Sequence, residues 1–136
     1  MNISFDFADL LKNLGQKFEI DIDPKIEGGL VLKIDQKYPI QIEFLEDRIV
    51  LSSKVGEILV SRFRHQVFSD ALKANLKSSC FGSLGYSDQQ KMLLLILNYP
   101  ILPPKEQEFF PMLDGFIAKT KEWTEALIAG NTRLLT

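Results

Sequence analysis

GLVLKIDQKYPIQIEFLEDRIVLS, residues 29–52, is the stretch that decides the fold class of this chain. Apolar residues occupy alternate positions in it, first at Leu30, Leu32 and Ile34 and then at Ile40, Ile42 and Phe44. A period of two residues places these side chains on one face of an extended chain. The stretch therefore predicts half-buried strands over Leu30–Asp35, Ile40–Glu46 and Arg48–Ser52, and the short turns between them predict an antiparallel meander.

The residues before this stretch predict a helix followed by another extended segment. Over Ser4–Leu14 the apolar residues recur at the spacing of one helix face, and Gly15 is the expected terminator. Phe18–Asp23 then alternates strictly between apolar and acidic residues. This alternation predicts a strand, or an extended segment, that Pro24 ends.

Beyond the meander, the period of the apolar residues changes to that of a helix. It predicts a middle helix from about Glu57 to Leu76 and a last helix from about Lys105 to Ala129. Pro111 should kink the last helix or delay its start, because proline removes a helical hydrogen bond. Gly130 should end that helix, and Asn131–Thr136 should form a frayed tail.

Two further strands are predicted between these helices. Lys91–Asn98 holds a continuous apolar run, as in a central strand with both faces covered, although its period fits a buried helix equally well. Phe81–Tyr86 predicts a shorter strand before it. The order helix, strands, helix, strands, helix predicts an α+β fold in one domain, residues 1–136, with an antiparallel twisted sheet packed with three helices.

Composition restricts the function classes. The chain has 136 residues, 46% of them hydrophobic and 25% charged, with a net charge of −2. No basic excess is present to neutralise phosphates, so nucleic acid is not expected as a partner. The longest apolar run, Met92–Leu97, is too short to cross a bilayer, and the N-terminus does not read as a secretory signal. A single cysteine fits a reducing compartment, so we expect a cytoplasmic protein without a membrane partner.

No catalytic or metal-binding signature stands out. His65 is the only histidine, and no cysteine or second histidine shares its helix face. Cys80 has no local sequence feature that would activate it as a nucleophile, and the acidic residues of 19–23 are more simply a solvated strand face. Residues 82–85, GSLG, lack the lysine that follows a phosphate-binding loop. We therefore expect no catalytic residues, no metal, no cofactor and no enzymatic activity.

A surplus of large apolar side chains favours a binding function instead. Phenylalanine occurs 10 times, which is hard to accommodate in one small core. Phe63 and Phe68 lie five positions apart, so they cannot both lie at the centre of one narrow helical stripe. The middle helix should then bury one face on its own sheet and another against a partner, since exposed apolar patches mark interfaces.

Several short motifs, in their order along the chain, resemble one known family. They are Leu10, Leu11 and Leu14 before Gly15; residues 29–35, GLVLKID; residues 72–75, LKAN; residues 84–86, LGY; and Leu113, Phe116 and Trp123 in the closing helix. Together they resemble the class I type III secretion chaperones, the Tir chaperone family of small acidic dimeric proteins. Tyr86 departs from the pattern because the family usually has an aliphatic residue there, and Pro111 interrupts the closing helix.

The resemblance implies a function without chemistry. It implies a bacterial cytoplasmic homodimer that binds the N-terminal segment of secreted effectors in extended form, keeps them soluble and export-competent, and delivers them to the secretion apparatus, with the secretion ATPase as a further candidate partner. It places dimer contacts on Phe63, Val67, Phe68, Ala71 and Leu72. It places effector contacts on Phe5, Phe7, Leu11, Ile42, Phe44, Leu93 and Leu95.

Three alternatives remain open from the sequence. The first is a regulatory subunit that pairs with a different chaperone. The second is a small-ligand-binding α+β domain, and the third is a structural component of a larger assembly. Failure to self-associate until a second chaperone is added would favour the first. A bound cofactor or detectable turnover would favour the second, and a stable complex of high mass would favour the third.

Overall fold

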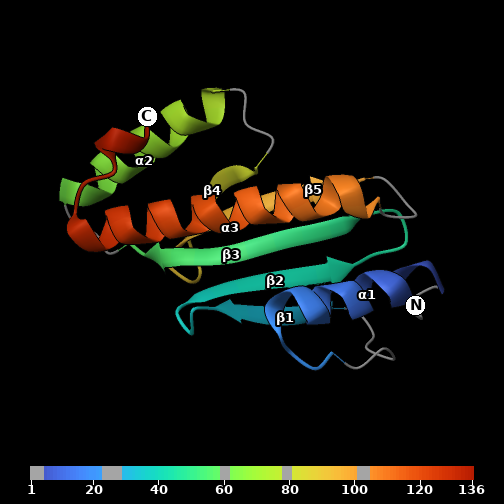
Figure 1. Ribbon diagram of the computed structural model, residues 1–136. Helices are drawn as coiled ribbons and strands as arrows, with labels where there is room; N and C mark the ends of the chain where they lie inside the picture. Colours follow the sequence, from blue (N-terminus) through green and yellow to red (C-terminus); the bar gives the residue numbers. More distant parts are fainter. Residues whose placement is uncertain (1–4, 23–28, 59–61, 78–80, 101–104) are drawn as a thin grey trace.

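The computed structural model describes residues 5–22, 29–58, 62–77, 81–100 and 105–136 (Figure 1). Its elements follow the predicted order of helix, strands, helix, strands, helix. They are α1 (Phe5–Phe18), β1 (Gly29–Ile34), β2 (Tyr38–Phe44), β3 (Ile49–Glu57), α2 (Arg62–Leu76), β4 (Ser83–Ser87), β5 (Met92–Tyr99), α3 (Glu106–Ala129) and the short 3-10 helix η1 (Arg133–Leu135). The predicted α+β class is confirmed.

The five described strands form one antiparallel sheet in the order β1-β2-β3-β5-β4. β1, β2 and β3 make the predicted meander, with Leu32 opposite Ile40 and Ile42 opposite Leu51. The apolar run of β5 pairs with β3 on one side and β4 on the other, so the strand reading of that run is confirmed. β1 and β4 are consequently the edge strands of the sheet.

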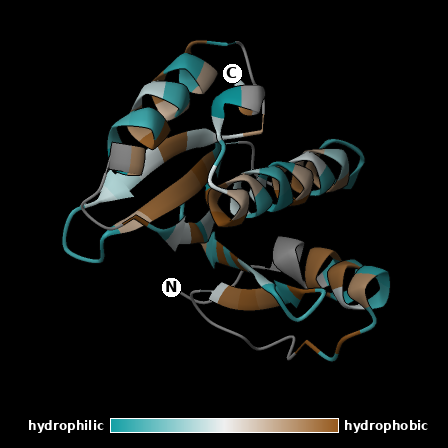
Figure 2. Ribbon diagram, turned by 90° about the vertical axis from the view of Figure 1, so that its left-hand side faces the viewer, coloured by the Kyte–Doolittle hydropathy of each residue, from teal (hydrophilic) through white to brown (hydrophobic). Residues whose placement is uncertain are grey.

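The buried side chains of the sheet lie on one face, which the helices cover. Leu32, Ile40, Ile42 and Leu51 alternate with exposed or half-buried residues along their strands. α3 crosses in front of the strands, α1 lies over β1 and β2, and α2 packs beside β4 (Figure 1). Figure 2 shows hydrophobic and hydrophilic residues around each helix, as expected of helices with one buried face.

The N-terminal prediction needs two corrections. α1 continues through Gly15 to Phe18, and residues 19–22 form no strand. The chain leaves the helix at Glu19, whose φ is 55°, and the Ile20 N–H donates back to the Gly15 carbonyl at 2.9 Å. Gly15 is needed for space rather than for termination, because a Cβ there would lie 2.9 Å from the Ile20 carbonyl oxygen.

The start of the middle helix differs from prediction, because Glu57 belongs to β3 and α2 begins at Arg62. The predicted range of the last helix, about Lys105 to Ala129, is confirmed by α3. Pro111 lies inside α3, so of its two predicted effects the late start is wrong. The predicted end at Gly130 is confirmed by its φ of 75°.

The predicted frayed tail is also wrong. Residues 133–135 form η1, which packs against α2, and Thr132 before it is fully buried. Its hydroxyl donates to the Asp70 carboxyl group at 2.6 Å. Specific hydrogen bonds to distant residues therefore fix a segment whose local sequence carries no periodic signal.

Candidate functional site

The first candidate surface lies on α2 and β4, and we call it the α2–β4 surface. Its members are buried, half-buried and exposed side chains around a shallow hollow of about 260 Å³. They are Phe68, Ala71, Leu72, Asn75, Leu84, Gly85, Tyr86 and Leu93. Leu72 is 67% exposed, and Leu76, one helical turn further along α2, is 87% exposed. Protruding leucines beside an apolar hollow are typical of a protein interface.

Asn75 holds α2 against the edge strand. Its side-chain amide donates to the Leu84 carbonyl and accepts from the Leu84 N–H, both at 2.8 Å. In the sequence, Asn75 stands out only as part of the LKAN motif, and no local pattern predicts its hydrogen bonds to Leu84. Residues two apart in a strand direct their backbone groups to the same side, so the backbone of Tyr86 faces the same free edge.

The predicted dimer residues are distributed between this surface and the core. Val67 and Ala71 are buried in their own chain, Phe63 and Phe68 are half-buried, and Leu72 is exposed. The Arg64 guanidinium lies over the rings of Phe68 and Tyr86, at 5.1 and 5.3 Å from the ring centroids. The outward side of α2 therefore carries an aromatic cluster with a cation stacked on it.

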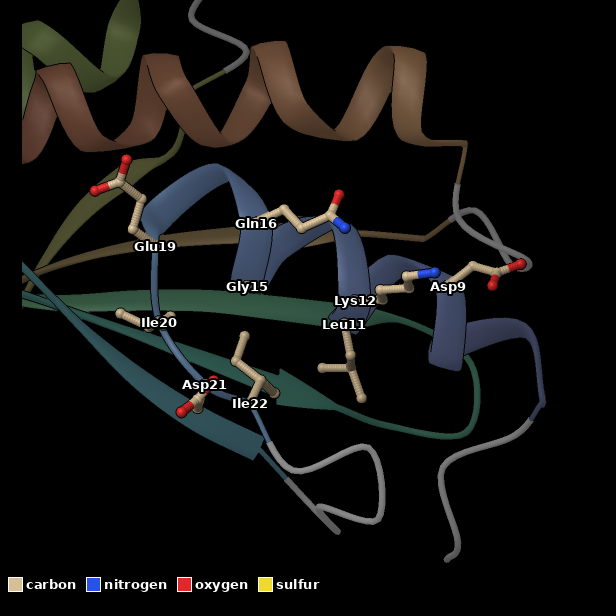
Figure 3. A pocket seen from close by; sticks show the side chains of 9 residues that line it. All are labelled: Asp9, Leu11, Lys12, Gly15, Gln16, Glu19, Ile20, Asp21 and Ile22. Carbon is tan, nitrogen blue, oxygen red and sulfur yellow. The ribbon is translucent and has the colours of Figure 1, made fainter.

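The second candidate surface is a groove of about 730 Å³ beside α1, which we call the α1 groove (Figure 3). Leu11 and Gly15 line it from the helix, and Ile20 and Ile22 line it from the segment that turns back after the helix. Charged and polar side chains complete its lining: Asp9, Lys12, Gln16, Glu19 and Asp21. The groove thus combines an apolar lining with a mostly acidic rim.

The walls of the α1 groove are held in place from outside. Asn13 donates to both carboxyl oxygens of Glu106 at 2.8 Å, and the Lys17 ammonium pairs with Asp114 at 3.2 Å, so α1 is fastened to α3. Residues 17–20 lie beside residues 32–35 of the edge strand β1 and the turn after it. The groove therefore continues towards an open sheet edge.

The predicted effector-binding residues lie mostly in the core. Leu11, Ile42, Phe44, Leu93 and Leu95 are buried in the isolated chain, although Leu11 also lines the α1 groove and Leu93 the α2–β4 hollow. The side chains of Phe5 and Phe7 lie outside the part of the chain that the structure describes. Two apolar side chains outside the predicted set are exposed. Ile20, which lines the α1 groove, is 41% exposed, and Val31, on the face of β1 turned away from the helices, is 63% exposed.

A charged cluster joins the β1–β2 turn to α3. The Lys37 ammonium and the Tyr38 hydroxyl both donate to the Glu125 carboxylate, and Lys121 pairs with Asp35 at 2.8 Å. Hydrogen bonds from Lys37 and Tyr38 lower the pKa of Glu125. The same bonds to Glu125 raise the pKa of Lys37 and of Tyr38. The charged groups of this cluster are paired with one another, so the cluster stabilises the packing of the β1–β2 turn against α3.

The residues weighed for chemistry are not brought together. His65 is exposed on α2, Cys80 and Asp23 lie outside the described residues, and Glu19 and Asp21 are exposed at the rim of the α1 groove. Within the described ranges, no three histidine, cysteine, aspartate or glutamate side chains lie close enough to hold a metal ion. No helix in these ranges has both the length and the apolar character of a membrane span.

Solved structures share this fold at low sequence identity. A chain of the ExoT–SpcS complex from Pseudomonas aeruginosa aligns with a TM-score of 0.66 at 15% identity, covering 88% of this chain and 98% of that one. A chain of the HopA1–SchA chaperone–effector complex aligns with a TM-score of 0.66 at 15% identity, covering 89% and 96%. A chain of the heterodimeric ExoU–SpcU complex from the type III secretion system of Pseudomonas aeruginosa aligns with a TM-score of 0.66 at 14% identity, covering 90% and 96%.

Sequence comparison gives the family. Comparison with curated proteins finds no match. The sequence model of one family, described as the Tir chaperone protein (CesT) family, matches residues 9–124. This range runs from α1 to near the end of α3 and includes every described strand. The chain belongs to the Tir chaperone protein (CesT) family.

Proposed function

We propose that this protein is a type III secretion chaperone. It binds the N-terminal segment of one or more secreted effectors in extended form, keeps them soluble and export-competent, and delivers them to the secretion apparatus in the bacterial cytoplasm. The observation that carries the proposal is the family match over residues 9–124. The shared fold with chains from a chaperone–effector complex and from a type III secretion complex supports it.

The working form that we propose is a homodimer joined at the α2–β4 surface. Leu72 and Leu76 protrude next to the hollow at Phe68 and Tyr86, so a knob and a hole lie on the same patch. Two copies related by a two-fold axis bring each knob to the other copy's hole, which makes the patch self-complementary. The free edge of β4 lies in the same patch and adds backbone groups to the contact.

We propose that the effector segment binds along the α1 groove and the β1 edge. An extended chain is able to add a strand at an open edge while its side chains enter neighbouring pockets. Ile20 offers an exposed apolar contact in the groove, and Leu11 lies in its lining. Val31 offers an exposed apolar contact on the other face of β1, where alternate side chains of an added strand would lie. Leu11 keeps its predicted role, whereas Ile42, Phe44, Leu93 and Leu95 support these surfaces from the core. Phe5 and Phe7 stay predicted contacts.

Delivery of the cargo to the secretion ATPase is part of the same proposal.

Binding of the cargo has an entropic cost. The chaperone holds its cargo in a non-globular state, and the entropy lost in ordering a long segment has to be offset by apolar contacts along that segment. Exposed side chains on the α2–β4 surface are available for the contact between copies, and those at the α1 groove are available for the contact with cargo. Pairing with a different chaperone, rather than with a second copy, is the alternative that the dimer experiment distinguishes.

Co-purification tests the proposed function. The chaperone is expressed in its source with an affinity tag, and the proteins that remain bound after washing at high salt are identified by mass spectrometry. We expect a larger secreted protein that is bound through its N-terminal segment, so deletion of that segment should abolish the complex. Recovery of the chain without any secreted protein, under conditions in which secretion is active, would contradict the proposal.

A further inference from the structure

One polar atom on the α2–β4 surface is left without a hydrogen bond. The Tyr86 hydroxyl is buried, and it has no hydrogen-bond partner among the described residues. A hydroxyl that leaves water without gaining a new partner destabilises its own chain. The unpartnered hydroxyl therefore points to an acceptor supplied from outside the isolated chain.

The neighbours of Tyr86 explain why the isolated chain does not satisfy the hydroxyl. The ring packs edge to face against Phe68, with centroids 4.9 Å apart, and the Arg64 guanidinium lies over the same two rings. Arg64 is a donor like the phenol, and it takes part in no ion pair among the described residues. Two donors thus lie side by side with no acceptor between them.

The acceptors that these donors lack are available on a second copy. β4 is an edge strand, and the Asn75 amide satisfies the backbone of Leu84 but not that of Tyr86. In a two-fold contact the β4 edge of each copy faces the same patch of the other, so backbone carbonyl oxygens approach Tyr86 and Arg64. Arg64 is half-exposed, so its side chain is able to turn and open the hydroxyl to the second copy.

We propose that Tyr86 and Arg64 form the polar centre of the contact between two copies of this chain, in which each copy supplies the hydrogen-bond acceptors that the other lacks. This inference rests on the proposed homodimer and adds the polar residues at its centre. A contact that brings no acceptor to Tyr86 leaves its buried hydroxyl without a hydrogen bond, so the arrangement in which the two β4 edges face each other is favoured.

Removal of the Tyr86 hydroxyl tests the inference. The dimer dissociation constant is measured by sedimentation for the parent, for Tyr86→Phe, and for Tyr99→Phe as a matched control. The Tyr99 hydroxyl accepts from the Lys105 N–H at 3.1 Å, away from the α2–β4 surface. We expect Tyr86→Phe to raise the dissociation constant about a hundredfold, because each of the two copies loses one buried hydrogen bond worth about tenfold. We expect Tyr99→Phe to leave it unchanged.

Unfolding of the monomer supplies the second readout. In a Leu72→Glu background, which keeps the chain monomeric, Tyr86→Phe should leave the urea midpoint unchanged or raise it, because the hydroxyl has no partner there. Tyr99→Phe should lower the midpoint. An unchanged dissociation constant in Tyr86→Phe would overturn the inference, and so would a lowered monomer midpoint. A monomeric parent would instead refute the proposed homodimer itself.

Discussion

At the scale of single residues, the most informative group is the buried carboxyl of Asp70. It lies in α2 with no exposed surface, and it accepts hydrogen bonds from Thr132 at 2.6 Å and from the Gln66 amide at 2.9 Å. Arg133 extends the network by donating to the side-chain amide oxygen (Oε1) of Gln66 at 3.1 Å. The segment after α3 therefore holds the helix that we place in the dimer contact.

Replacement of Thr132 should show the value of this network. Thr132→Val keeps the shape of the side chain but removes the donor to a buried carboxyl group. We expect the free energy of unfolding to fall by about 1–3 kcal/mol, the usual cost of leaving such a group unsatisfied. Thr132→Ser restores the donor and should recover most of the loss. Equal stability of the valine and serine variants in urea titrations would refute this role.

The cluster at Glu125 predicts a pH dependence. Hydrogen bonds from Lys37 and Tyr38 lower the pKa of Glu125 below its usual value of 4.5. The contribution of Glu125 to stability is therefore present above pH 4.5 and is lost as the pH falls through the lowered folded-state pKa. Glu125→Gln should destabilise the chain at pH 7, and the difference should shrink as the pH is lowered below 4.5 to pH 3. A thermal-unfolding difference that stays constant between these pH values would contradict the assignment.

At the scale of secondary-structure elements, the outward side of α2 should control self-association. Leu72→Glu places a charge at a position that is 67% exposed, so the monomer should still fold. We expect the dimer dissociation constant to rise by at least a hundredfold, because a carboxylate would have to be buried in an apolar contact. Ile128→Glu on α3 is the matched control, since Ile128 is also 67% exposed. Similar sedimentation behaviour of the two variants would move the contact elsewhere.

The α1 groove should control cargo binding without affecting self-association. Ile20→Glu adds a third acidic residue beside Glu19 and Asp21 and removes an exposed apolar contact. We expect the amount of co-purified secreted protein to fall at least fivefold while the dimer dissociation constant stays unchanged. Ile128→Glu again serves as the control. Undiminished recovery of cargo would exclude the groove as its binding site.

Some elements were predictable from sequence because their signal is local. The alternation in residues 29–52 and the helical stripe of α3 reflect burial on one face, and both appear as predicted. The end of α1 was not predictable in this way, because the close approach of Ile20 to Gly15 depends on where the chain goes next. The tail was missed because Thr132 finds its partner 62 residues earlier in the chain.

The candidate surfaces show the same limit. The predicted effector contacts are strongly apolar residues, and Ile42, Phe44 and Leu95 among them are core positions. Core and interface side chains share one chemistry, and only the packing of other elements decides which of them stay accessible. Exposed positions such as Ile20 and Val31 therefore required the structure. The role of Asn75 follows from its hydrogen bonds to Leu84, nine residues later in the chain. The role that we propose for Tyr86 follows from the lack of a hydrogen-bond partner for its hydroxyl among the described residues.

At the scale of the whole molecule, the described strands form one helix-covered sheet with β1 and β4 as its edge strands and a candidate surface beside each. The α2–β4 surface and the α1 groove lie at opposite ends of the strand order, so self-association at one leaves the other open. A dimer built in this way presents two copies of the α1 groove to a single extended segment. Binding at two linked sites strengthens the capture of that segment without any new kind of contact.

Native mass spectrometry of the protein purified from its source tests the central claim most directly. The account predicts a complex with two copies of the 15.5 kDa chain and one copy of a larger secreted protein. Gentle activation in the instrument should release that protein and leave a dimer of the chain. A bare monomer of 15.5 kDa, with no secreted protein at any concentration, would contradict the account.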